Sequence, residues 1–288
     1  MDNNKKIINQ RYIDPLSDFG FKRLFGHEEI MIPFLNAVMN LENPIKSLEY
    51  IDKELQPEAV NGRNIIFDML CKLDSGEEVI VEMQDARQKH FGERILFYMS
   101  RAITSQRKHG EGWDYGIDPI NGVYLLNFEQ EKGHPKTYRH LRLYDDDHEP
   151  FLPDKLQFWV LELPPYRKMK PEDCKNKTDY WLYNLANMKT MKDDLPFRSQ
   201  ISELEKLQNW AEICSMSEEE LRQWDRRMKR QWDNYAVEEC MKEEAREEGL
   251  AEGRAEGRAE GKLQERNRIA EKLRALMSED EIQRLLSN

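Results

Sequence analysis

The sequence predicts an α/β protein in which a compact core is followed by a helical extension and a charged repeat tail. Three observations lead to this fold class. Short apolar runs typical of strands alternate with helical segments up to about residue 170, apolar residues recur at helical spacing after that point, and four-residue repeats containing glycine occupy the last part. We therefore expect three regions, residues 1–170, 171–240 and 241–288.

The first helix is expected between Asp14 and Gly26, in the segment DPLSDFGFKRLFG. Asp14 or Ser17 can cap its start, and Gly26 can end it. The other core elements are expected in the order helix 31–40, strand 45–56, hairpin 67–84, helix 88–109, and strands 122–129, 140–145 and 156–163. Helical spacing then covers 178–191, 200–214 and 217–241.

Composition limits the environments in which the chain is expected to work. Its formal charge of −11 provides no general attraction to nucleic acid, so any phosphate-binding surface must be local or supported by metal ions. The four cysteines form no CxxC pair, which favours reduced thiols in a cytoplasmic protein. The first residues contain no apolar signal segment, and no apolar run is long enough for a membrane span.

The segment FDMLCKLDSGEEVIVEMQ, residues 67–84, has the pattern of a β-hairpin with an acid in each arm. Asp74–Gly76 fits a three-residue turn whose last position requires the left-handed conformation that glycine adopts. Leu73 then lies opposite Glu77, and the same register places Asp68 directly opposite Glu82. Side chains directly opposite each other share a face of the sheet, with Cβ atoms about 5 Å apart.

Two carboxylates in that position repel each other unless a cation lies between them. The side chains of Asp68 and Glu82, with the backbone carbonyl of Met83, form an oxygen donor set of the kind that Mg²⁺ accepts. Gln84 lies two residues beyond Glu82 and therefore on the same face. An exposed face of an edge hairpin carrying two unrelated acids would give the same pattern, and a two-residue turn would shift the register by one.

A series of basic residues follows the hairpin at intervals of seven: Arg87, Arg94, Arg101 and Lys108. On a helix this spacing gives one basic stripe, which suits a phosphate backbone passing the two acids. A solvated helix face produces the same spacing.

Together these motifs resemble the recombination-promoting nuclease / putative transposase family, within the PD-(D/E)XK nuclease superfamily. The matching segments are DPLSDFGFKRLFG, the hairpin, RQKHFGERILFYMSRAITSQ, GVYLLNF and LQFWVLELPPY, which together cover roughly residues 11 to 170. The resemblance implies a restriction-endonuclease-like αβββαβ core. It also implies Mg²⁺- or Mn²⁺-dependent hydrolysis of DNA phosphodiester bonds.

The resemblance assigns roles residue by residue. Asp68 matches the metal-binding acid, Glu82 and Gln84 match the (D/E)-x-K pair, and Asp18 matches an additional acid of many members. By this resemblance, Asp68, Glu82 and the Met83 carbonyl bind the metal, and Gln84 positions the attacking water. Glutamine replaces the lysine of the superfamily; its amide can hold a water molecule but brings no charge.

Two other function classes are compatible with the same residues. One is a catalytically weak DNA-binding or transposition accessory protein that keeps the fold. The other is a toxin-like nuclease restrained by its tail or by a partner. The joint presence of Asp68, Glu82 and Gln84 favours an active enzyme over the accessory protein.

The tail repeats AEGR, AEGR and AEGK between residues 246 and 262. Each glycine costs a helix up to about 1 kcal/mol relative to alanine, so a single helix of this sequence is marginal. It is either a solvated arm or a helix that packs on a second copy, and the second interpretation predicts a homodimer or a larger assembly. Apolar residues that could extend such a contact are Ile269, Leu273, Leu276, Ile282, Leu285 and Leu286.

Overall fold

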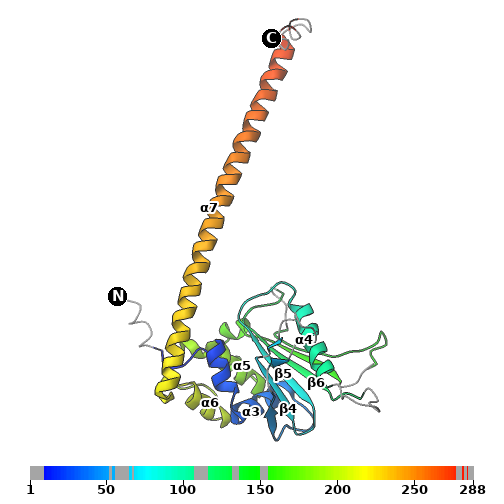
Figure 1. Cartoon of the computed structure of the whole chain (residues 1–288), viewed down its shortest axis with the longest axis vertical. Helices are drawn as coiled ribbons and strands as arrows, with labels where there is room; N and C mark the ends of the chain where they lie inside the picture. Colours follow the sequence, from blue (N-terminus) through cyan, green and yellow to red (C-terminus); the bar gives the residue numbers. More distant parts are fainter. Residues whose placement is uncertain are drawn as a thin grey trace. The chain divides into compact units, whose positions relative to one another are not determined.

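A six-stranded mixed sheet lies at the centre of the first part of the chain (Figure 1). This computed structural model describes residues 10–51, 54–55, 65–66, 68–106, 116–131, 136–149 and 155–276, together with 281 and 284. The strand order is β1 (Leu48–Tyr50), β4 (Met69–Leu73), β5 (Glu78–Gln84), β6 (Ile120–Leu126), β8 (Leu156–Glu162) and β7 (Tyr138–Leu141). β5, β6 and β8 are parallel to one another, and the other neighbours are antiparallel. A separate two-stranded sheet joins β2 (Glu54–Leu55) to β3 (Ile65–Ile66).

The central strands are covered on both faces. Every residue of β6 is buried, as are Val79, Ile80 and Val81, three consecutive residues of β5. Helix α4 (Phe91–Ser105) covers one face, where Met99 and Ala102 pack on Ile80. Helices α2, α3, α5 and α6 lie on the other side of the sheet (Figure 1). Continuous apolar runs such as VYLL are typical of strands with this double burial.

Helix α2 (Asp18–Phe25) begins at the second of the two predicted capping residues. The Ser17 Oγ accepts a hydrogen bond from the Gly20 N–H at 3.0 Å and donates one to the Asp14 carbonyl at 2.7 Å. A Cβ on Gly20 would lie 1.9 Å from the Asp14 carbonyl oxygen. Only glycine therefore allows the chain before the helix to fold back on its first turn.

Helices from the second half of the chain pack on those from its start. α3 (Glu28–Met39) contacts both α5 (Lys177–Asn187) and α6 (Glu203–Ala211), and α2 contacts α6. The Phe34 and Trp181 rings meet edge to face at 5.7 Å. Burial of these apolar faces against each other joins the predicted extension to the core helices.

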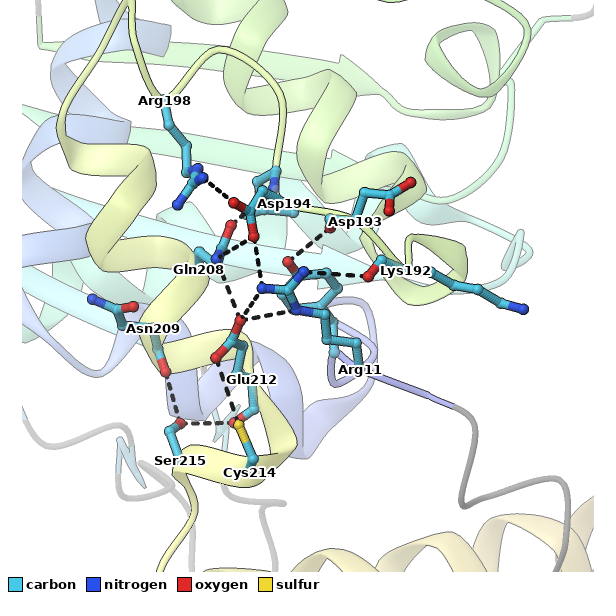
Figure 2. Close-up of polar contacts among 12 residues, drawn as sticks. Arg11, Lys192, Asp193, Asp194, Arg198, Gln208, Asn209, Glu212, Cys214 and Ser215 are labelled. Atoms are coloured by element: carbon cyan, nitrogen blue, oxygen red, sulfur yellow. Dashed lines mark hydrogen bonds and ion pairs between the residues drawn. The ribbon is translucent and has the colours of Figure 1, made fainter.

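A short segment near the N-terminus pairs with the chain around residue 212 (Figure 2). The Ile13 N–H donates to the Ala211 carbonyl at 2.9 Å, and the Ile213 N–H donates to the Arg11 carbonyl at 3.0 Å. The Arg11 guanidinium contacts the carboxylates of Asp194 and Glu212, each at 2.7 Å (Figure 2). These contacts link the two ends of a segment of about two hundred residues.

The chain divides into two compact units, Met1–Leu221 and Arg222–Asn288. Helix α7 (Glu218–Leu276) has 59 residues and includes most of the second unit. At 1.5 Å per residue it is about 90 Å long. Within the residues that the structure describes, no helix combines the length and the apolar character of a membrane span. The three regions expected from the sequence, residues 1–170, 171–240 and 241–288, stay a prediction.

Most predicted elements are present, with shifts at their ends. The single strand expected at 45–56 is wrong, because β1 belongs to the six-stranded sheet and β2 to the two-stranded sheet. The order α3, β1, β4, β5, α4, β6 is consistent with the expected αβββαβ core. The helix expected at 88–109 begins only at Phe91 and ends at Ser105. The strands expected at 122–129 and 156–163 correspond to β6 and β8, whereas the strand expected at 140–145 overlaps β7 only at residues 140–141.

Candidate functional site

The hairpin of β4 and β5 has the register that its turn predicted. Met69 pairs with Val81 and Leu70 with Ile80, and the same register places Asp68, the residue directly before β4, opposite Glu82. The turn closes with a hydrogen bond from the Leu73 N–H to the Glu77 carbonyl at 2.8 Å. Gly76 has a φ of +92°, the left-handed conformation that the three-residue turn requires.

The two carboxylates are held by backbone donors across the hairpin. The Asp68 N–H donates to Glu82 Oε1 at 3.1 Å, and the Met83 N–H donates to Asp68 Oδ2 at 2.9 Å. Glu82 is only 3% exposed, whereas Asp68 is partly buried. The alternative of an exposed edge hairpin is wrong, because β5 lies between β4 and β6 and α4 covers the Ile80 face.

Burial makes the ionised form of this pair costly. The pKa of Glu82 is raised from 4.5 to about 8, first by burial and then by the neighbouring Asp68 charge, against the hydrogen bond from the Asp68 N–H. Burial also raises the pKa of Asp68, while the Met83 N–H opposes that shift. Without a cation, the two groups therefore resist carrying two negative charges together at neutral pH.

Gln84 lies on the same face and contacts the pair directly. Its Nε2 donates to Glu82 Oε2 at 3.3 Å, and its side chain is buried. The Met83 carbonyl points to the β4 side, as its N–H does, because both groups of a strand residue point in one direction. The hairpin thus brings two carboxylates, one backbone carbonyl and one amide to the same end of β5.

Asp18, the additional acid, lies in the first turn of α2, where it forms an ion pair with Lys22. Both charges act on Asp68: Lys22 lowers the pKa of Asp68 and Asp18 raises it. The Asp18 side chain is 55% exposed. In the described part of the chain, no three His, Cys, Asp or Glu side chains gather closely enough to bind a metal ion. Asp18 is therefore a neighbour of the carboxylate pair and does not complete a three-acid cluster.

Arg94 is the basic residue that meets the carboxylates. Its Nη2 lies 3.6 Å from Glu82 Oε2, and its guanidinium lies over the Tyr98 ring at 5.2 Å from the ring centre. Its charge lowers the pKa values of both Asp68 and Glu82. The seven-residue spacing predicted that Arg94 and Arg101 share one side of the helix. It did not predict that Arg94 contacts Glu82.

The predicted basic stripe needs one correction. Arg87 precedes the first residue of α4 and is not on the helix; its Nη2 donates to the Gln130 carbonyl at 2.6 Å. The left-handed His90 separates it from the helix, with a φ of 60°. Arg94 and Arg101 do lie on one side of α4, whereas Lys108 lies outside the described residues.

Tyr124 is a neighbour of the site that sequence reasoning missed. It pairs with Glu82 in the parallel register of β5 and β6, and it is 1% exposed. Within the described residues its hydroxyl has no hydrogen-bond partner. Its ring lies over Gly122, where an added Cβ would be 2.5 Å from a ring carbon. The glycine inside the strand segment GVYLL could have indicated this position, because a glycine within a strand often marks a place where another group lies close to the backbone.

Comparison with known proteins gave one match. The model of the family described as PD-(D/E)XK nuclease family transposase matches residues 15–240. Among curated proteins nothing matched, and neither did any solved structure. The matched range contains the hairpin, α2 and α4, and thus every described residue of the candidate site.

Proposed function

Since the chain belongs to the PD-(D/E)XK nuclease family transposases, we propose that it is a DNA endonuclease that requires Mg²⁺ or Mn²⁺. The observation that carries this proposal is the carboxylate pair of Asp68 and Glu82. The fold holds the two groups opposite each other, with Glu82 buried and its pKa raised to about 8. Such a pair suits a site that receives a cation.

The donor set fits a hard divalent cation. Asp68 and Glu82 offer carboxylate oxygens and Met83 offers a carbonyl, the ligand types that Mg²⁺ and Mn²⁺ prefer. When bound, the ion would polarise a phosphate oxygen and lower the pKa of a water molecule. Gln84 would hold that water through its amide, which is already fixed by Glu82 at 3.3 Å. Asp18 would act at a distance, through a water molecule or a second ion.

The basic residues around the site supply the phosphate contacts in this proposal. Arg94 and Arg101 follow each other along α4, and Arg87 lies at the loop before it. Guanidinium groups match phosphate oxygens in shape and charge. Because the whole chain has a charge of −11, this local group of arginines has to provide the attraction. Lys108 extends the group in the sequence.

We further propose that α7 is a self-association arm that makes the protein a homodimer or a larger assembly. Beyond residue 236 its described large apolar side chains are exposed: Met241 is 64% exposed, Leu250 53%, Leu263 59% and Ile269 49%. The side chains of Leu273, Leu276, Ile282, Leu285 and Leu286 lie outside those described. A largely polar helix with a glycine at every fourth position of its repeats is marginal by itself, and packing on a second copy would stabilise it. Two cores held together would cut both strands of a duplex.

A catalytically weak accessory protein is the second candidate, because Gln84 stands where the superfamily has lysine and would slow the reaction. The amide brings no positive charge to the transition state. Supercoiled plasmid incubated with the full-length protein in Mg²⁺, Mn²⁺ or EDTA separates the two candidates. The nuclease nicks or linearises plasmid only with a divalent ion, and Glu82→Gln abolishes the reaction. An accessory protein binds the plasmid and leaves it intact under all three conditions.

A further inference from the structure

Helix α4 exposes two adjacent large apolar side chains, although the helix packs on the sheet. Leu96 is 56% exposed and Phe97 57% exposed. The residues of α4 that face the core are Phe91, Met99 and Ala102, all buried. Successive residues of a helix are about 100° apart, so Leu96 and Phe97 lie on different flanks of the solvent side.

The side of α4 that carries Phe97 is also the side that contacts the carboxylate pair of Asp68 and Glu82. Phe97 lies three residues after Arg94 and four before Arg101, and this spacing places the three side chains together on the helix surface. Arg94 in turn lies 3.6 Å from Glu82. Leu96 lies on the other flank, with Gly92 four residues before it. An exposed aromatic ring between two arginines therefore adjoins the candidate active site.

On this flank Arg94 and Arg101 outnumber the one acid of α4, Glu93, and they favour a nucleic acid as its occupant. At 1.5 Å per residue, Arg94 and Arg101 are about 10 Å apart along the axis, with Phe97 between them. A strand whose phosphates contact the arginines presents its bases at the level of the ring. In an intact duplex both faces of each base are already stacked, whereas an unpaired base has a free face for an aromatic side chain.

We propose that Phe97 stacks on an unpaired base beside the scissile phosphate, so that the substrate class is single-stranded or locally unpaired DNA. This inference rests on the proposed function, because it takes the strand next to Asp68 and Glu82 to be the one that is cut. Stacking on a ring accepts any base, so Phe97 adds affinity without sequence preference. The ring is carried on a helix fixed to the sheet by Met99 and Ala102, and its position is therefore set before DNA binds.

Binding of fluorescent oligothymidylate and of a duplex of equal length, measured by anisotropy in EDTA with the full-length protein, tests the inference. Phe97→Ala should weaken single-strand binding roughly 5- to 150-fold, the range that follows from removing one stacked base. Phe97→Trp should keep wild-type affinity. Leu96→Ala is the matched control, since it removes an equally exposed apolar side chain from the other flank and should change nothing. Duplex binding should stay within about twofold for all three variants.

Three binding results would overturn the inference. The first is an equal loss of affinity in Phe97→Ala and Leu96→Ala, the second is an equal loss for Phe97→Ala on duplex and single strand, and the third is no loss on either DNA. A fall in molar mass of Phe97→Ala in light scattering would also overturn it, because the ring would then belong to a contact between copies. Wild-type protein that binds neither DNA in EDTA and also leaves plasmid intact in Mg²⁺ and Mn²⁺ would instead refute the proposed function. Wild-type binding that Phe97→Ala leaves unchanged refutes only the role of Phe97.

Discussion

Replacing Glu82 by glutamine should stabilise the metal-free protein at alkaline pH. The folded state raises the pKa of Glu82 from 4.5 to about 8. Between pH 4.5 and about pH 8, Glu82 therefore carries a proton in the folded state that it has lost in the unfolded chain. Its contribution to stability is therefore fully present below about pH 4.5 and is lost as the pH rises through about 8. Glutamine keeps the size of the side chain and removes the titration.

The size of the effect follows from the same two values. Each pKa unit is worth about 1.4 kcal/mol, so the wild-type free energy of unfolding should fall by on the order of 3 kcal/mol between about pH 5 and pH 8. The charge of Asp68 contributes to the raised pKa of Glu82, hence this figure belongs to Asp68 and Glu82 as a pair. In Glu82→Gln most of this pH-dependent decrease in the free energy of unfolding should disappear.

Urea unfolding in EDTA at several pH values, followed by circular dichroism, measures this difference. Glu49→Gln is a matched control, because it makes the same change at an exposed position of β1 and should keep the wild-type pH dependence. Adding Mg²⁺ should stabilise the wild type and leave Glu82→Gln unchanged, since only a protein that binds the ion gains stability from it. If wild type and Glu82→Gln lose stability in parallel as the pH rises, the burial argument is refuted.

The other predictions concern catalysis, binding, assembly and packing. Asp68→Asn should abolish metal-dependent plasmid cleavage with an unchanged circular dichroism spectrum; residual cutting at the wild-type rate would exclude Asp68 from the site. Arg101→Glu should lower the slope of log affinity against log salt on duplex DNA by roughly 0.9, whereas an unchanged slope would make it a solvated surface residue. Truncation after residue 237 should give the mass of a monomer in light scattering and slow linearisation while nicking continues; a truncated protein that stays dimeric would place the contact elsewhere. Gly122→Ala should cost about 1–3 kcal/mol in urea unfolding, because the methyl group meets the Tyr124 ring, and an unchanged midpoint would show that the ring moves freely.

The sequence alone determined the features that depend on neighbouring residues. Ser17 capped its helix, and the turn at Asp74–Gly76 set the hairpin register. From that register the opposition of Asp68 and Glu82 followed by counting. These features were predictable because a cap or a tight turn is set by a few adjacent residues and their backbone conformations.

Tertiary structure decided how the hairpin is used. Whether the face with Asp68 and Glu82 is exposed to solvent or buried depends on the packing of α4. The burial of Glu82 is the main cause of its raised pKa. The position of Tyr124 beside Glu82 depends on a parallel pairing across a connection of more than thirty residues. The pairing of Arg11 with Glu212 joins positions 201 residues apart. Local sequence patterns do not record such contacts, because they form only where the packing of distant segments brings the groups together and removes water from them.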